Sequence, residues 1–131
     1  MTTVQPHVLA LPWTSPPLNL NQRHGHWKKA RITRQVRETV RILAISQHLP
    51  RDLPHVTVGL HYRPRDNRRR DADNLVATLK ACCDGLVDFG IVADDTPDLM
   101  AKHMPTIHPA TKGQPAAVWL TLEWETTTHG N

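Results

Sequence analysis

The chain has 131 residues and a formal net charge of +4; 39% of its residues are hydrophobic and 21% are charged. This length suits one domain with a real core, so we expect a single domain over residues 1–131 with flexible tails at 1–6 and 126–131. Aromatic residues make up only 5% of the chain, which disfavours a protein that reads single strands by stacking their bases. The basic balance suits a polyanionic partner.

The first half of the chain predicts a strand, a loop and a helix. Residues 7–13 form a short, mostly apolar run that ends at Pro12 and the turn-rich TSPPLN sequence, as strands often do. Residues 14–29 are polar and irregular. Helical periodicity follows from about Ala30 to Leu49, and its apolar stripe consists of Ile32, Val36, Val40 and Leu43.

The second half predicts an alternation of strands and a helix. Residues 55–63 alternate apolar and polar side chains, as a half-buried strand does. A helix is expected to begin near Asp73 or Asn74, which are good capping residues, and to end near Gly90. Its apolar stripe, which can face a sheet, consists of Leu75, Leu79, Cys82 and Leu86. Two further strands are expected at 99–107 and 117–125. The order β-α-β-α-β-β predicts an α+β fold, a mixed sheet packed with two main helices.

Several features bear on the compartment and on cofactors. Cys82 and Cys83 are adjacent in the expected helix, where neighbouring side chains diverge, so we expect no disulfide and a reducing compartment. The amino terminus lacks a signal-peptide pattern, and no apolar run approaches membrane-spanning length. The sequence has no P-loop, no GxGxxG motif and no zinc-type histidine spacing. We therefore expect a cytoplasmic protein without a nucleotide cofactor or a membrane partner.

The segment Arg68-Arg69-Arg70-Asp71-Ala72-Asp73-Asn74 is the most informative motif, and Asp94-Asp95 follows it later in the chain. Arginines attract and orient phosphate groups. Clustered carboxylates are poor phosphate ligands unless a divalent cation lies between them and the nucleic acid. The combination therefore predicts a nuclease that depends on Mg²⁺, for which Mn²⁺ is a possible substitute.

The expected helix places a lysine beside these carboxylates. Positions 73, 77, 80 and 84 share one helical face, and Asp71 converges with Asp73 if the backbone between them is extended. Asp71, Asp73 and Asp95 would then hold the metal, and Lys80 would stabilise developing negative charge. The simpler alternative is that Asp73 caps the helix and that Asp94-Asp95-Thr96-Pro97 forms a turn.

A wider basic surface is also expected to contact DNA. The three arginines at 68–70 are expected to bind phosphates rather than bases. Trp27, Lys28 and Lys29 are candidates for a second contact. Further cations follow on the first helix, where a solvated face with Arg34 paired to Glu38 is the alternative; they are Arg31, Arg34, Arg37 and Arg41.

These motifs resemble those of the RusA-type Holliday junction resolvases, a family common in bacteria and their prophages. The matching pieces are RRRDADN at 68–74, LKACCDGL at 79–86, FGIVADD at 89–95 and the opening LPWTSPPLNLN. In this chain VAT intervenes between the DNL segment and the lysine, an insertion of nearly one helical turn. The match covers most of the chain.

The resemblance implies a Mg²⁺-dependent homodimer that places symmetric paired nicks in a four-way DNA junction. By motif, Asp71, Asp73 and Asp95 correspond to the metal ligands, and Lys80 corresponds to the catalytic lysine of the helix. A two-fold dimer suits a junction because both have approximate two-fold symmetry. Two alternatives stay open: a nuclease for flaps, forks or other branched DNA, and a DNA-structure-binding protein that has lost catalysis.

Overall fold

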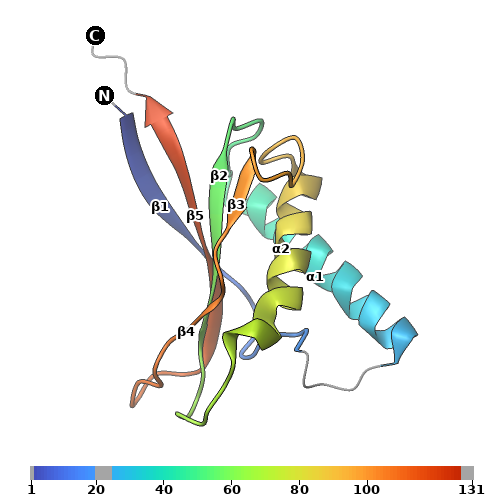
Figure 1. Cartoon of the computed structure of the whole chain (residues 1–131), viewed down its shortest axis with the longest axis vertical. Helices are drawn as coiled ribbons and strands as arrows, with labels where there is room; N and C mark the ends of the chain where they lie inside the picture. The colour runs from blue at the N-terminus through green and yellow to red at the C-terminus, as the bar shows by residue number, and fades with distance from the viewer. Residues whose placement is uncertain (1, 20–24, 128–131) are drawn as a thin grey trace.

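A mixed sheet is covered on one face by two helices in this computed structural model, which describes residues 2–19 and 25–127 (Figure 1). The α+β class and the mixed sheet with two main helices are confirmed. The elements are β1 (Thr2–Ala10), α1 (His26–Ser46), β2 (Val56–Arg63), the 3₁₀ turn η1 (Ala72–Leu75), α2 (Val76–Phe89), β3 (Met100–Lys102), β4 (Thr106–Ile107) and β5 (Ala117–Thr127).

The sheet has the order β1-β5-β2-β3, and β4 also pairs with β2. Strand β5 is antiparallel to both of its neighbours, whereas β3 and β4 run parallel to β2. The β1–β5 ladder extends from Thr2↔Thr127 to Ala10↔Trp119. The predicted flexible tails at 1–6 and 126–131 overlap this ladder, which includes residues 2–6 and 126–127.

Several element boundaries differ from those predicted. The first strand is Thr2–Ala10 rather than 7–13, and helix α1 ends at Ser46 rather than at Leu49. Helix α1 begins at His26 rather than near 30, and residues 26–30 are all exposed, so apolar periodicity gives no sign of this first turn. The single strand predicted at 99–107 is two short strands, and Pro105 precedes the second. Residues 20–24 of the predicted loop lie outside the described residues.

The core lies between the sheet and the helices. Alternate residues of β2 face the helices and are buried, and the predicted apolar stripe of α2 is buried as well. These residues are Val56, Val58, Leu60, Tyr62, Leu75, Leu79, Cys82 and Leu86. Both cysteine thiols are free and buried, and burial raises their pKa. Helix α2 is therefore fixed from the sheet side by apolar contacts.

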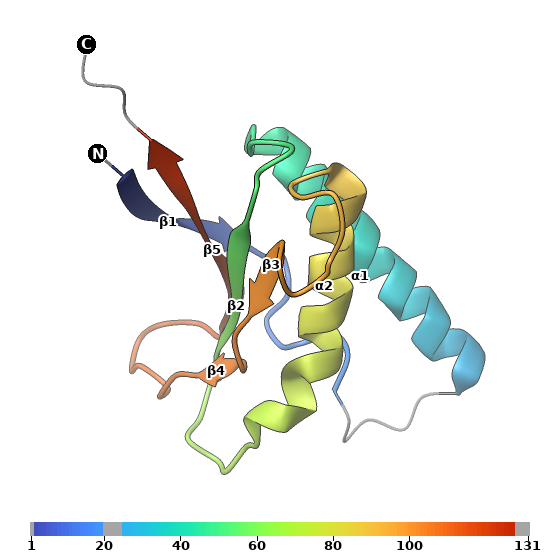
Figure 2. The same ribbon diagram turned by 45° about the horizontal axis from the view of Figure 1, so that its top comes forward.

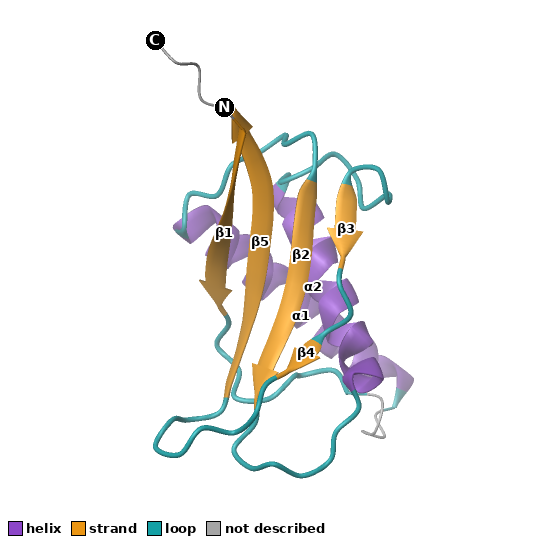
Figure 3. Ribbon diagram, turned by 60° about the vertical axis from the view of Figure 1, so that its left-hand side comes forward, coloured by secondary structure: helices purple, strands orange, loops and turns teal. Residues whose placement is uncertain are grey.

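The opposite face of the sheet carries no helix among the described residues (Figure 3). His61 and Trp119 stack there with their ring centroids 5.5 Å apart, and His108 stacks on both. The Nδ1 atom of His61 lies 2.9 Å from Nε2 of His108. Burial among these rings lowers the pKa of His61, because a charged imidazole loses hydration there.

The two helices make a close crossing at Gly85. A Cβ atom at this position would lie 2.5 Å from the carbonyl oxygen of Arg37 in α1. One turn further on, the Arg37 guanidinium forms two hydrogen bonds to the Asp88 carboxylate at 2.8 and 3.0 Å. Both helices begin at the same end of the molecule (Figure 2). Gly85 thus sets how closely α1 approaches α2.

We expect Gly85→Ala to lower the free energy of unfolding by about 1–3 kcal/mol, the usual cost of overpacking a core. On an open helix the same change would raise the free energy of unfolding, because alanine is the better helix former. A decrease would therefore show that the added methyl group clashes with α1. Gln35→Ala, at an exposed position of α1, is the control and should change stability by less than about 0.5 kcal/mol. Urea unfolding measures both; a stabilised Gly85→Ala protein would contradict the crossing.

Candidate active site

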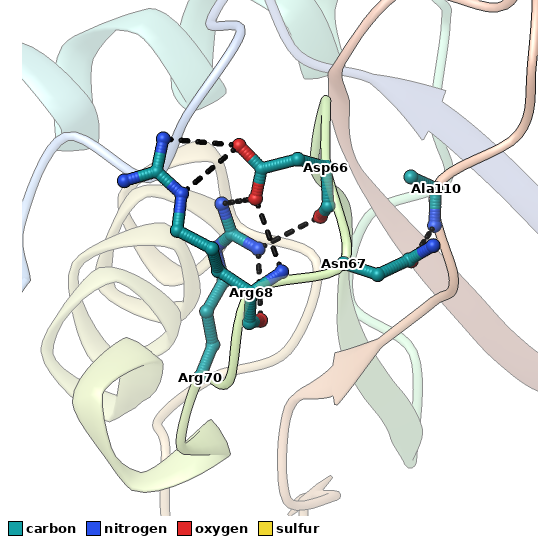
Figure 4. A network of polar contacts seen from close by, with 5 residues as sticks. All are labelled: Asp66, Asn67, Arg68, Arg70 and Ala110. Carbon is teal, nitrogen blue, oxygen red and sulfur yellow. Dashed lines mark hydrogen bonds and ion pairs between the residues drawn. The ribbon is translucent and has the colours of Figure 1, made fainter.

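The arginine segment is organised by an aspartate that precedes it (Figure 4). The Oδ1 atom of Asp66 accepts hydrogen bonds from the backbone N–H of Arg68 at 3.1 Å and from the Arg70 guanidinium at 2.9 Å. Its Oδ2 atom accepts one from Nε of Arg68 at 3.2 Å. These hydrogen bonds lower the pKa of Asp66 to about 2, and the bond from the Arg68 backbone has the largest effect. Asp66 thus stays ionised and shapes the loop.

The three arginines are consequently not equivalent. The Arg70 guanidinium also donates to the carbonyl oxygens of Asp66 and Arg68, at 2.9 and 3.1 Å, and lies 5.9 Å from the centre of the Tyr62 ring. It is half-buried, whereas Arg69 is exposed. Among the described residues, Arg69 makes no side-chain hydrogen bond or ion pair. Arg69 is therefore the guanidinium most available to a phosphate.

A polar cavity of about 420 Å³ opens beside this segment, and we call it the arginine cavity. Its lining includes Arg68, Arg69, Arg70, Asp71 and Asn74 from this segment, and Ser15, Pro16 and Asn19 from the loop that follows β1. The cavity therefore depends on how that loop is held against α2.

Thr78 fastens this loop to α2. Its Oγ1 atom donates a hydrogen bond to the carbonyl oxygen of Leu18 at 2.6 Å and accepts one from the Leu18 N–H at 3.1 Å. Thr78 has no exposed surface, so neither backbone group of Leu18 has water as a ready substitute. No local sequence pattern predicts this contact, because the partners are 60 residues apart.

Asp71 and Asp73 lie at the turn into α2, and both are exposed. Asp71 is extended, but η1 begins at the next residue, so the alternation expected to bring the two side chains together does not apply. Neither η1 nor α2 has a side-chain cap, so the predicted capping by Asp73 or Asn74 is wrong. Among the described residues, the carboxylates of Asp71 and Asp73 make no hydrogen bond or ion pair.

A second cavity, of about 380 Å³, is lined by the first residues of α2 and by residues 95 and 102–105, and we call it the lysine cavity. Its polar wall contains Lys80, Asp95, Lys102 and His103. The Nζ atom of Lys102 donates to Oδ2 of Asp95 at 3.3 Å. Sequence reasoning missed Lys102, because no local pattern links the end of β3 to the loop that carries Asp95.

The two cavities distribute the predicted site residues around η1. Asp71 lines the arginine cavity, Lys80 and Asp95 line the lysine cavity, and Asp73 belongs to the turn that connects them. Within residues 2–19 and 25–127, no three His, Cys, Asp or Glu side chains are grouped to hold a metal ion. Magnesium does not require such a group, because it usually takes one or two carboxylates and completes its shell with water and substrate phosphates. The two free carboxylates fit that mode.

The basic surface at the start of α1 is partly as predicted. Trp27 is 84% exposed, and Lys28 and Lys29 are exposed beside it. Farther along, Arg37 pairs with Asp88, and Arg41 pairs with Glu38. The predicted pairing of Arg34 with Glu38 is therefore wrong, and two of the six cations in this stretch are already neutralised by carboxylates.

Neither the protein-family models nor the curated proteins compared with this sequence give a match. The resemblance to the RusA-type resolvases thus stays a prediction from the sequence. In the described part of the chain, neither helix combines the length and the apolar character needed to cross a membrane.

We expect Thr78→Val to lower the free energy of unfolding by about 1–3 kcal/mol, because it leaves two backbone groups of Leu18 buried without partners. Thr33→Val is the matched control, because the Thr33 hydroxyl donates only to a carbonyl oxygen of its own helix. That oxygen also takes part in the backbone hydrogen bonding of the helix, so the change does not leave it without a partner. Chemical denaturation and proteolysis of the loop after β1 measure the effect. Equal stability of the two variants would show that Thr78 does not hold the loop.

Proposed function

We propose that the chain is a Mg²⁺-dependent endonuclease that resolves four-way DNA junctions by symmetric paired nicks. One observation carries the proposal: the unengaged guanidinium of Arg69 and the unengaged carboxylate of Asp71 line the same cationic cavity, and the unengaged carboxylate of Asp73 belongs to the adjoining turn η1. Phosphodiester hydrolysis needs both, an anchor for phosphate and oxygen ligands for a cation.

Arg69 would bind a phosphate of the DNA backbone, while Asp66 and Tyr62 keep Arg68 and Arg70 in place around it. Contacts of this type orient the strand without reading its sequence. The exposed Trp27, Lys28 and Lys29 stand at the start of α1, at the end of the molecule where α2 also begins (Figure 2). They would extend the same surface along the DNA.

Asp71 and Asp73 would hold Mg²⁺ together with a DNA phosphate, and Asp95 would join them from the lysine cavity. Bound Mg²⁺ supplies charge neutralisation and an activated water. Lys80, exposed on α2, would stabilise the negative charge that develops on the phosphate. Asp95 would have to give up its contact with Lys102 in order to bind the metal. The ammonium group of Lys102 would then be free beside the DNA strand.

A homodimer would allow both equivalent strands of the junction to be cut. A four-way junction presents two equivalent strands related by approximate two-fold symmetry, and each chain has one set of site residues. An isologous dimer would therefore deliver one set to each strand.

The direct test is cleavage of a labelled four-way junction with and without Mg²⁺, beside flap, fork and linear duplex substrates of the same sequence. We expect paired symmetric nicks in the junction alone, and only with the metal. Cleavage of flaps or forks but not junctions would support the broader branched-DNA nuclease. Tight junction binding without any nicking would support the inactive binding protein.

Asp73→Asn should reduce the cleavage rate at least about 100-fold, because it removes a metal ligand in the reacting complex. Junction affinity in EDTA should be unchanged or higher, since a repulsive charge has gone. The control is Asp52→Asn, an exposed carboxylate in the turn after α1 whose positive φ of 58° asparagine also tolerates. An Asp73→Asn protein that cuts at the normal rate would rule out this site.

Arg69→Ala should weaken binding to junction and duplex alike and reduce the slope of log affinity against log salt by about 1. Arg65→Ala removes the same charge from an exposed position of the same loop that lines neither cavity. It should change the slope less. Fluorescence anisotropy over a salt series gives both slopes, and equal slopes for the two variants would refute a specific phosphate contact at Arg69.

A further inference from the structure

The lysine cavity joins two chemically different walls. Besides the polar residues already named, its lining contains four apolar residues, which we call its apolar wall: Val76, Leu79, Met104 and Pro105. We propose that this cavity binds one unstacked nucleotide of a DNA strand, with the base against Met104 and Val76 and the phosphate at Lys80 and Lys102. This inference rests on the proposed function and adds to it a reason for choosing branched DNA.

Two side chains of the apolar wall are exposed to solvent, where a bound ligand would cover them. Met104 is 59% exposed and Val76 is 42% exposed, although each belongs to a different element, Val76 to the first turn of α2 and Met104 to the loop between β3 and β4. Single exposed apolar side chains are common, whereas these two, from different elements, line one cavity. The loop is held in place, because the His103 N–H donates to the carbonyl oxygen of Val58 at 3.0 Å.

The polar wall selects an anion. Its lining includes two ammonium groups, those of Lys80 and Lys102, and a single carboxylate, that of Asp95, which pairs with Lys102. The wall therefore keeps an excess of positive charge even while Asp95 holds Lys102. His103 adds a further hydrogen-bonding side chain at the rim. A ligand with one flat apolar part and one anionic part complements both walls, and a nucleotide has this composition.

The size of the cavity limits the ligand to one such unit. A volume of about 380 Å³ lies at the lower end of the range for small-molecule pockets. In a duplex the faces of each base are covered by its neighbours, so only a base that has left the stack can lie against Met104. Extruding a base costs least where its pairing and stacking are weakest. The bases at the branch point of a junction lack a continuous stack, so one of them would leave the helix most readily there, beside the carboxylate of Asp95.

The test compares Met104→Ser with Val8→Ser, which removes a 60% exposed apolar side chain from β1. Binding is measured in EDTA to a four-way junction that carries 2-aminopurine at the branch point, and to a linear duplex. We expect Met104→Ser to weaken junction binding about five- to tenfold, for the loss of part of one buried side chain. Duplex binding should not change. Val8→Ser and Met104→Leu should behave as the unaltered protein, and the 2-aminopurine signal should be lost only in Met104→Ser.

Three results would overturn this site. Equal junction affinity for Met104→Ser and Val8→Ser would show that no base lies against Met104. An equal loss on linear duplex would show that the contact does not require an unstacked base. A change in molar mass with Met104→Ser, measured by light scattering, would show that a second copy of the chain covers the wall. If the unaltered protein cuts junctions with Mg²⁺, these results leave the proposed function intact; if it neither binds nor cuts them, both proposals fall.

Discussion

The position of α2 is the constraint on which both cavities depend. The helix is buried against the sheet through Leu79, Cys82 and Leu86, and against α1 through the close approach at Gly85. It therefore cannot rotate without opening the core. The turn η1 that leads into this helix lines the arginine cavity, the first turn of the helix lines the lysine cavity, and Thr78 ties the loop after β1 to the same helix. One well-packed helix thus places side chains that lie far apart in the sequence.

The chemistry of the surface is decided by which charges are left unengaged. Asp66 engages two of the three consecutive arginines and leaves Arg69 to solvent. Asp95 is engaged by Lys102, whereas Asp71 and Asp73 have no such partner among the described residues. Exposed ion pairs of this kind are weak, so the proposed DNA and cation would be able to displace them. We therefore expect the side chains of the proposed site to reach their final arrangement only when the substrate binds.

The sequence predicted the features that repeat regularly and missed those that do not. The alternation of β2, the apolar stripe of α2 and the end of that helix at Gly90, which has the left-handed φ of 98°, all follow from local periodicity or backbone preference. The exposed first turn of α1 has no apolar stripe, and η1 replaces the regular helix expected at Asp73. The contacts Thr78–Leu18 and Lys102–Asp95 are tertiary, so no local pattern encodes them.

The central claim is that DNA crosses the start of α2, with Asp71, Asp73 and Asp95 facing its backbone. A crystal structure of the protein with a four-way junction and Ca²⁺, an oxygen-binding cation of the same charge, tests this most directly. The claim predicts a cation between a DNA phosphate and at least two of the three aspartates, with Arg69 on a neighbouring phosphate. DNA bound across the opposite face of the sheet, over Trp119, with these carboxylates in solvent, would contradict it.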